Sequence, residues 1–278
     1  MEKFGQLYYQ LCGGRKGVSM SQIFVTGDVH QTHDILKLRM FRKGDGAQLT
    51  KDDYVIVCGD FGLLWSNPYT LKYYGEEGFS LASNPKDKYW NNQEYNLLRW
   101  YDACPWTTLW VDGNHENFDR LETYPVTEWN CGHVQKISDS VIHLMRGEVY
   151  EIDGRKIFCF GGAMSTDRGP AVGDEEESIY KWWWPQEIYN DKEAENAYDN
   201  LEKNNCKVDF IITHDCPAGV NQFNRYRISK VSNFLEQIRQ TTNFTHWYCG
   251  HMHFDDDFGK VSVLYKRIVP LGKFVNED

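Results

Sequence analysis

Short apolar runs of strand character recur along the chain between residues 23 and 249. They are nearly continuous in hydrophobicity and rich in β-branched or aromatic side chains, which is typical of strands buried on both faces. The six runs are IFVT at 23–26, YVIVC at 54–58, TTLWV at 107–111, KIFCF at 156–160, DFIIT at 209–213 and HWYC at 246–249. Between many of them, apolar positions spaced three and four residues apart predict helices over 33–42, 91–103, 191–203 and 229–240.

Two other regions predict strands that follow one another without an intervening helix. Residues 141–162 contain turn signals at Arg146-Gly147 and Asp153-Gly154, and residues 260–272 have the same pattern. The whole pattern therefore predicts an α/β fold with two sheets. No internal repeat or linker interrupts residues 20–278, which we interpret as one domain. Residues 1–19 do not fit the pattern, and we interpret them as a flexible or non-native extension before a start at Met20.

Composition narrows the class of protein. The net charge of −10 opposes an extended nucleic-acid footprint. No apolar run is long enough to cross a bilayer and no secretory signal precedes the first strand, so we expect no membrane partner and a cytoplasmic location. The eight cysteines are scattered without a C-x-x-C pair, which indicates reduced thiols. Two polar segments, 66–90 and 163–190, predict long loops, and loops of that length are usually functional or disordered.

Polar side chains of the same kinds follow five of the predicted strands. In an α/β sheet, ligands bind beyond the carboxyl ends of the strands, so we expect these side chains to converge on one crevice. Glycines at four of the exits allow the backbone to turn sharply there. The five exits read Gly27-Asp28-Val29-His30, Gly59-Asp60, Gly113-Asn114-His115, His214-Asp215 and Gly250-His251-Met252-His253.

Such a concentration of carboxylate, amide and imidazole groups is costly unless cations bind to it. A pair of divalent ions is the natural candidate, and this mixture of nitrogen and oxygen ligands suits manganese, iron or zinc better than calcium or magnesium. A shared carboxylate can hold two ions roughly 3.5 to 4 Å apart, the separation at which one hydroxide can bridge them and attack phosphorus. In this interpretation Asn114 is a ligand and His115 lies beside the metals.

The order of these motifs over residues 28–253 resembles that of the calcineurin-like metallophosphoesterases: Asp-x-His, Gly-Asp, Gly-Asn-His-Glu, His and Gly-His-x-His. The resemblance implies a four-layer αββα sandwich with a dinuclear site. It also implies a role for His115, which would protonate the leaving oxygen or bind the phosphate. By matching positions, it implies that one metal is held by Asp28, His30, Asp60 and His253, and the other by Asp60, Asn114, His214 and His251, with Asp60 as the bridge.

One motif departs from the family pattern. Many members, including the Ser/Thr protein phosphatases, read Gly-Asp-x-x-Asp-Arg-Gly, where the second Asp orients the catalytic His and the Arg grips phosphate. This chain reads GDFGLLW, with leucines at both places, which argues against a protein phosphatase of that kind. Three nearby carboxylates remain candidates for orienting His115: Asp112, Glu116 and Asp119.

Candidate substrate-binding residues lie on the second long segment. Arg168 is the only arginine on the loop that follows the 156–160 strand, and its forked donors suit a substrate phosphate. Trp182, Trp183 and Trp184 cannot all enter one core, so we expect an indole either to line the crevice and stack on a flat group or to cover a sheet edge or partner. Asp215 is a candidate for orienting a ligand or capping a turn. We interpret four histidines as structural or solvated: His33, His133, His143 and His246.

The sequence thus predicts a metal-dependent phosphoric ester hydrolase, with manganese, iron or zinc in its dinuclear site. It would hydrolyse a phosphomonoester or phosphodiester by direct attack of a metal-bridging hydroxide. We expect a small phosphorylated substrate, nucleotide-like compounds included. One alternative is a nuclease for short oligonucleotides, which the negative charge disfavours. Another is a catalytically inactive scaffold on the same fold, which the complete set of ligand positions disfavours.

Overall fold

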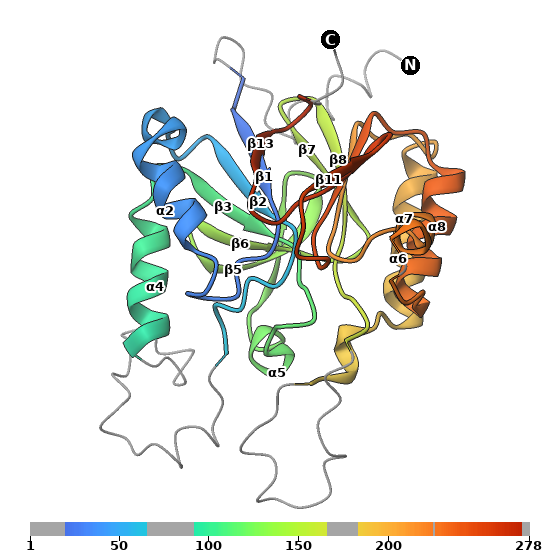
Figure 1. Ribbon diagram of the computed structural model, residues 1–278, viewed down its shortest axis with the longest axis horizontal. Helices are drawn as coiled ribbons and strands as arrows, with labels where there is room; N and C mark the ends of the chain where they lie inside the picture. The colour runs from blue at the N-terminus through green and yellow to red at the C-terminus, as the bar shows by residue number, and fades with distance from the viewer. Residues whose placement is uncertain (1–19, 66–91, 166–182, 225, 274–278) are drawn as a thin grey trace, which may run out of the picture.

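A computed structural model describes residues 20–65, 92–165, 183–224 and 226–273 (Figure 1). The predicted extension at 1–19 lies outside these residues, as do Arg168, Trp182 and most of the two long polar segments. Among the described residues, no helix is both long and apolar enough to cross a membrane. The seven described cysteines are all free.

The first sheet has seven strands, and its central four run parallel. Strands at both edges pair antiparallel with their neighbours. In spatial order the strands are β13 (Ile268–Pro270), β1 (Ile23–Thr26), β2 (Tyr54–Val57), β3 (Thr107–Trp110), β6 (Val141–Leu144), β5 (Gly132–Ser138) and β4 (Val126–Trp129).

The second sheet has six strands, and it too has a parallel centre with antiparallel edges. In spatial order its strands are β11 (Asp256–Phe258), β12 (Val261–Val263), β10 (His246–Cys249), β9 (Phe210–Thr213), β8 (Arg155–Phe160) and β7 (Glu148–Ile152).

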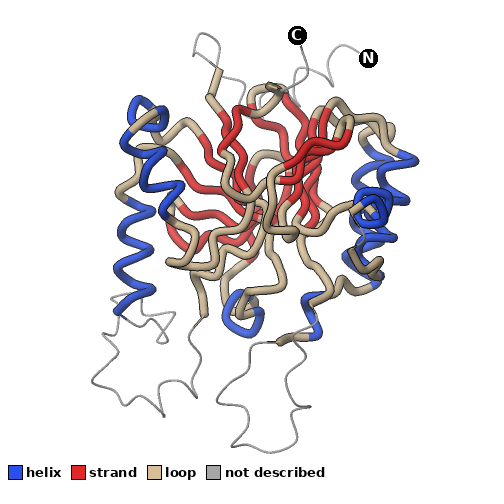
Figure 2. Tube along the Cα trace, viewed as in Figure 1, coloured by secondary structure: helices blue, strands red, loops and turns tan. Residues whose placement is uncertain are grey.

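Helices cover the outer face of each sheet, as Figures 1 and 2 show. The first sheet is covered by α2 (Leu36–Lys43) and α4 (Asn92–Asp102). The second is covered by α6 (Asp191–Lys203), α7 (Ala218–Phe223) and α8 (Lys230–Thr241). Three short elements complete the described part: η1 (Asp45–Gln48), α5 (Phe118–Leu121) and η4 (Pro185–Glu187).

Three hydrophobic cores separate these four layers. In β2, Ile56 packs into the core between the sheets, whereas Val55 and Val57 pack against the helices, because successive side chains of a strand point to opposite faces. The same holds in β9, where Ile212 lies in the central core and Ile211 lies beneath the outer helices. The predicted four-layer αββα sandwich of two mixed sheets is therefore confirmed.

Side-chain caps fix the starts of the two longest helices on the second sheet. Asn190 precedes α6, and its Oδ1 accepts the Glu193 N–H at 3.1 Å. Ser229 precedes α8, and its Oγ accepts the Ser232 N–H at 2.9 Å. Such caps satisfy backbone donors that the first helical turn leaves unpaired.

The sequence pattern located most strands but did not say which of the two sheets each would join. The Asp153-Gly154 turn does join a hairpin, β7 to β8, with both residues at positive φ. The Arg146-Gly147 turn instead carries the chain from β6 in the first sheet to β7 in the second, and the chain crosses back between β12 and β13. The β4–β5 hairpin and the edge strand β11 were not predicted, because their short runs are half-exposed and polar.

Candidate metal centre

The predicted crevice exists at the carboxyl ends of the parallel strands of both sheets. From the first sheet it receives Asp28 and His30 after β1, Asp60 after β2 and Asn114 after β3. The second sheet contributes His214 directly after β9, and His251 and His253 after β10. The side chains fall into two groups that could hold a metal ion, and Asp60 belongs to both.

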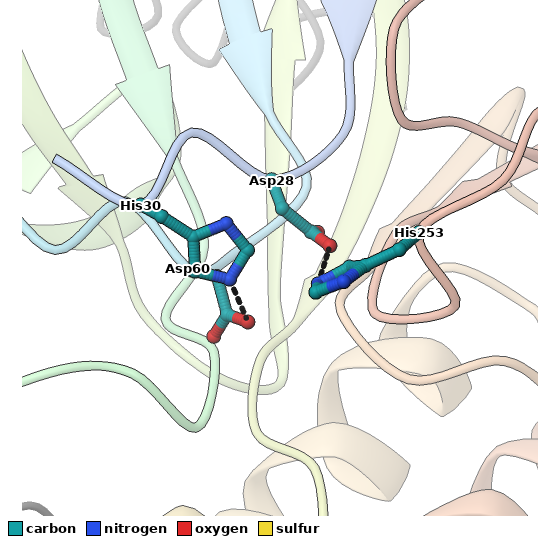
Figure 3. A group of neighbouring side chains, drawn as sticks. All are labelled: Asp28, His30, Asp60 and His253. Atoms are coloured by element: carbon teal, nitrogen blue, oxygen red, sulfur yellow. Dashed lines mark ion pairs between the residues drawn. The ribbon is translucent and has the colours of Figure 1, made fainter. Parts of the chain in front are cut away.

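The first group consists of Asp28, His30, Asp60 and His253, whose ligand atoms all lie within 4.8 Å of one another (Figure 3). His30 Nε2 lies 3.2 Å from Asp60 Oδ2, and His253 Nε2 lies 3.2 Å from Asp28 Oδ2. Two atoms bound to one zinc ion at roughly 2.0 to 2.2 Å are themselves about 3 Å apart, so these separations fit ligands of a common ion.

The second group consists of Asp60, His214 and His251, again with ligand atoms within 4.8 Å of one another. His214 Nε2 lies 3.2 Å from Asp60 Oδ1 and 3.1 Å from Asn114 Oδ1. Asp60 therefore turns Oδ2 toward the first group and Oδ1 toward the second. This is the arrangement that a bridging carboxylate requires.

Hydrogen bonds on the far side of the imidazole rings decide which nitrogen faces the centre. His214 Nδ1 donates to the Cys58 carbonyl at 2.8 Å, and since a carbonyl only accepts, that nitrogen carries the proton. His30 Nδ1 pairs with Asp34 Oδ2 at 2.8 Å in the same way. Both Nε2 atoms are thus left to point their lone pairs into the centre, as metal-binding histidines do.

Backbone amides hold the two carboxylates. Asp60 Oδ1 accepts the His115 N–H at 2.8 Å, and Asp28 Oδ1 accepts the His251 N–H at 2.9 Å. Asp28 Oδ2 is buried and has no hydrogen bond, although His253 Nε2 is nearby. An orphaned carboxylate oxygen opposite an imidazole nitrogen is costly without a cation between them. The residues present therefore fit a divalent metal site.

Without a metal, the centre attracts protons. Burial lowers the pKa of His214, but the carboxylates of Asp60 and Asp28 outweigh burial and raise this pKa to about 10. His30 is partly buried, which lowers its pKa, but Asp60, Asp28 and Asp34 outweigh this and raise the pKa to about 9. The excess negative charge that holds these protons is the charge that a dication would neutralise.

Four of the seven predicted ligands have left-handed backbone conformations. Their φ angles are 44° at His30, 45° at Asp60, 65° at His251 and 52° at His253. Such conformations cost about 1 to 3 kcal/mol each in non-glycine residues and cluster at functional sites. The fold therefore tolerates local strain to aim these side chains at one point.

The glycines before the ligands have two different purposes. Gly59 has φ +87°, so it makes the sharp turn that we expected. At Gly113 φ is not positive, and the reason for glycine is space, because an added Cβ would lie 2.1 Å from Asp60 Oδ1. A side chain there would collide with the carboxylate shared by the two groups.

His115 lies at the centre but in neither ligand group. Its partly buried ring is 5.3 Å from the His30 ring and 6.3 Å from that of Trp65. Both oxygens of Glu116 accept backbone N–H groups, from Phe61 and Gly62. Neither Glu116 nor Asp112 hydrogen-bonds to His115 in the described part of the chain. The partner that orients His115 stays a prediction.

Asp112 has a structural environment of its own. Its oxygens accept hydrogen bonds from Arg146 and from His143 Nε2, the latter at 3.1 Å. The Arg146 guanidinium outweighs burial and holds the pKa of Asp112 well below its ordinary value. His143 also pairs with Gln135 at 2.9 Å, so it is a structural residue, as we predicted.

The other histidines and Asp215 also have identifiable structural contacts. His133 pairs with Glu148 at 3.0 Å, buried His246 with Ser262 Oγ at 2.8 Å, and exposed His33 with the His30 carbonyl at 3.1 Å. Asp215 does not hydrogen-bond to a predicted ligand in the described part. It accepts the Cys216 N–H at 2.7 Å, which fits the turn-capping interpretation.

The tryptophan prediction needs correction at Trp184. This side chain is fully buried, its Nε1 donates to Asp119 Oδ2 at 2.9 Å, and its ring lies edge-on to Trp65 at 5.9 Å. A buried indole of this kind cannot offer a free face to a substrate. Trp183 is partly buried, while Trp182 and Arg168 lie outside the described residues.

A cavity of about 250 Å³ opens beside the ligand groups. Asp60, Asn114 and His115 line it. It is also lined by Asn221 of α7 and by Tyr226 and Arg227, which precede α8. Sequence reasoning missed these three residues, because they belong to no recognisable motif and the segment has no clear periodicity.

Known proteins resemble the chain over this same region. A sequence profile described as calcineurin-like phosphoesterase matches residues 21–255. A lariat debranching enzyme of Schizosaccharomyces pombe is 23% identical over 252 residues, which cover 81% of this chain and 50% of that enzyme. One from Drosophila melanogaster is 20% identical over 219 residues, covering 73% of this chain and 38% of that enzyme. The chain thus spans half or less of the length of these curated relatives.

Proposed function

Because the chain belongs to the calcineurin-like phosphoesterase family, we propose that its two ligand groups hold two divalent cations and that it hydrolyses a phosphodiester. The observation that carries the proposal is the position of Asp60, which turns one oxygen toward each group at 3.2 Å from a histidine of that group. Manganese, iron and zinc suit this donor set.

The proposed ligands divide as the motifs imply. Asp28, His30, Asp60 and His253 would hold one ion, and Asp60, Asn114, His214 and His251 the other. When bound, the pair would neutralise phosphate charge and supply an activated water.

Neighbouring groups would hold the proposed ligands and the His115 ring in place for the reaction. Asp34 and the Cys58 carbonyl keep two imidazoles turned toward the centre. The His115 N–H fixes Asp60, so the His115 ring is held next to the shared carboxylate. From there it would donate a proton to the leaving oxygen, a transfer that contributes typically 10² to 10⁴ in rate.

A diester is favoured over a monoester by the matched relatives. They are named for debranching lariats, which requires cleavage of a diester linkage. A monoesterase remains the competing outcome of the test below. An inactive scaffold is disfavoured, because every proposed ligand of the described centre faces it.

The test compares two substrates and two proteins. The full chain, loaded with manganese, iron or zinc, is assayed with bis-p-nitrophenyl phosphate and with p-nitrophenyl phosphate, alongside Asp60→Asn. We expect metal-dependent hydrolysis, faster for the diester and lost in the variant. Faster hydrolysis of the monoester would overturn the diester assignment. Absence of hydrolysis with all three metals, or full activity of Asp60→Asn, would overturn the proposed centre.

A further inference from the structure

Two side chains between α7 and α8 border the cavity that several proposed metal ligands also line. Tyr226 and Arg227 line the same cavity as Asp60 and His115. Both are exposed, Tyr226 by 44% of its surface. They therefore face the space that a substrate must enter to reach the centre, without taking part in either ligand group.

Tyr226 is tied to the segment that carries two of the ligands. Its hydroxyl donates to the carbonyl of Met252 at 3.2 Å, and Met252 lies between His251 and His253. Its ring stacks on Phe254, with centroids 6.1 Å apart and planes inclined by 23°. One face of the ring is thus packed and the hydroxyl is anchored, while a large part of the ring stays open. A ring fixed in this way can stack at a low entropic cost.

Further rings extend from Tyr226 across the surface. Phe254 contacts Phe258 at 6.4 Å, and Phe258 contacts Phe223 at 5.5 Å. Phe223 is 76% exposed. We call Tyr226, Phe254, Phe258 and Phe223 the aromatic strip. Its two end rings, Tyr226 and Phe223, are exposed, whereas Phe254 and Phe258 are partly buried against the core of the second sheet. The exposed ring at the cavity end is a surface for flat groups, because every nucleobase has a face that can stack.

Arg227 adds a positive charge to this border. Among the described residues it is the only lysine or arginine that lines the cavity, and it makes no ion pair with any of them. Its neighbours in the cavity wall include the carboxylates Asp60 and Asp215. A guanidinium binds phosphate through paired donors, so a second phosphate of the substrate would supply the missing partner.

Buried hydrogen bonds hold this border in place. Asp215 Oδ1 accepts from Asn221 Nδ2 at 3.2 Å, and Asp215 Oδ2 accepts from Ser229 Oγ at 3.1 Å. The residue after His214 therefore fastens the chain on both sides of Tyr226 and Arg227. Asn221 Oδ1 is buried in the cavity wall without a hydrogen bond, and it is an acceptor for a substrate hydroxyl or amino group.

We propose that Tyr226 and Arg227 recognise a nucleotide unit next to the scissile phosphate. The base stacks on Tyr226, at the start of the aromatic strip, and Arg227 pairs with the neighbouring phosphate. The substrate class is then a short nucleotide diester with a neighbouring phosphate, which a protein of net charge −10 can bind through one local cation. This inference rests on the proposed phosphodiesterase activity.

The test uses esters with the same leaving group. Methyl p-nitrophenyl phosphate offers the scissile diester alone, thymidine 5′-(p-nitrophenyl phosphate) adds a nucleoside, and its 3′-phosphorylated derivative adds a second phosphate. Wild type should prefer the thymidine ester over the methyl ester in kcat/KM by about tenfold to a hundredfold, as expected for one base on one aromatic ring. The 3′-phosphate should increase kcat/KM about tenfold further.

Substitutions test whether Tyr226 causes the preference for the thymidine ester and whether Arg227 causes the gain from the 3′-phosphate. Tyr226→Ala and the bulkier Tyr226→Leu should reduce the thymidine preference at least fivefold, while Tyr226→Phe should keep most of it. Tyr198→Ala is the matched control, because Tyr198 is also 44% exposed but lies on α6. Arg227→Ala should remove the gain from the 3′-phosphate, Arg227→Lys should keep part of it, and Arg99→Ala on the far helix α4 should keep it fully.

The outcomes separate this inference from the proposed function. If wild type hydrolyses none of the esters with any of the three metals, the phosphodiesterase proposal fails. If wild type hydrolyses the methyl and thymidine esters with equal kcat/KM, the nucleotide inference fails while the phosphodiesterase stands. The nucleotide inference also fails if Tyr226→Ala and Tyr226→Leu keep the wild-type preference, or if Tyr198→Ala loses it to the same degree.

Discussion

Replacing Asp60 by asparagine should empty both metal positions, and the charges of the centre set the size of the effect. The first group has two carboxylates, so Asp60→Asn leaves it with one. The second group has only the carboxylate of Asp60, with Asn114, His214 and His251 neutral as ligands, so the variant leaves it with none. The second position should therefore lose its ion first.

The energy of that loss can be bounded. Two opposite unit charges 4 Å apart attract each other by about 4 kcal/mol at an effective dielectric constant of 20. The attraction between a carboxylate and a dication is about twice as large. The amide oxygen of asparagine still attracts the ion and so recovers part of this energy. A remaining loss of about 4 kcal/mol corresponds to a factor of about 10³ in affinity for each ion.

Metal analysis of purified protein measures the effect. Wild type loaded with manganese and passed through a desalting column should retain close to two equivalents, and Asp60→Asn well under one. Asp215→Asn is a local control, since Asp215 is buried beside the same cavity but faces Asn221 and Ser229. Retention of two equivalents by Asp60→Asn, with unchanged affinity in a chelator competition, would refute the assignment of Asp60 as the bridge.

Three further predictions follow from the described contacts. His115→Ala should keep its metal while turnover of alkyl esters falls roughly 10²- to 10⁴-fold, with a smaller loss for p-nitrophenyl esters; equal losses would indicate phosphate binding instead of proton donation. Gly113→Ala places a Cβ 2.1 Å from Asp60 Oδ1, so metal content should fall as in Asp60→Asn, whereas Gly219→Ala on α7, whose Cβ would first meet the flexible end of Glu236 at 3.2 Å, should keep both ions. Burial lowers the pKa of His246 to about 4, so the stabilisation that depends on neutral His246 is present above pH 6.5 and is lost as the pH falls toward 4. In urea unfolding of the metal-free protein, the free energy of unfolding of wild type should fall by up to about 3 kcal/mol more than that of His246→Gln as the pH is lowered from 6.5 to 4. Equal decreases in the two proteins would contradict this.

The two candidate ligand groups could be predicted because each of their parts is local in sequence. A glycine and a ligand at the end of an apolar run can be recognised without knowing the neighbours of the strand, and parallel strands bring such ends together. Asp28, Asp60 and His251 are in this category, and the structure places all three in the two candidate ligand groups.

The parts that were missed depend on partners distant in sequence. Trp184 is buried because Asp119, 65 residues earlier, accepts its N–H, and no pattern around the three tryptophans indicates this. The change of sheet at Gly147 depends on which core accepts the following strand, and apolar alternation is the same in either sheet. Tyr226 carries no motif, and its position follows from contacts with Met252 and Phe254.

The distribution of the ligands along the chain has a consequence for protein synthesis. Asp28, His30, Asp60 and Asn114 precede the second sheet in the chain, and the first proposed ligand from that sheet, His214, lies 100 residues after Asn114. The last, His253, is followed by β13, which pairs with β1 through Phe24 and Pro270. A nascent chain emerging from the ribosome would therefore present half a centre while the residues between Asn114 and His214 are being made. High-affinity metal uptake should follow the synthesis of His253, and metal content would report how much of a newly made population has folded this far.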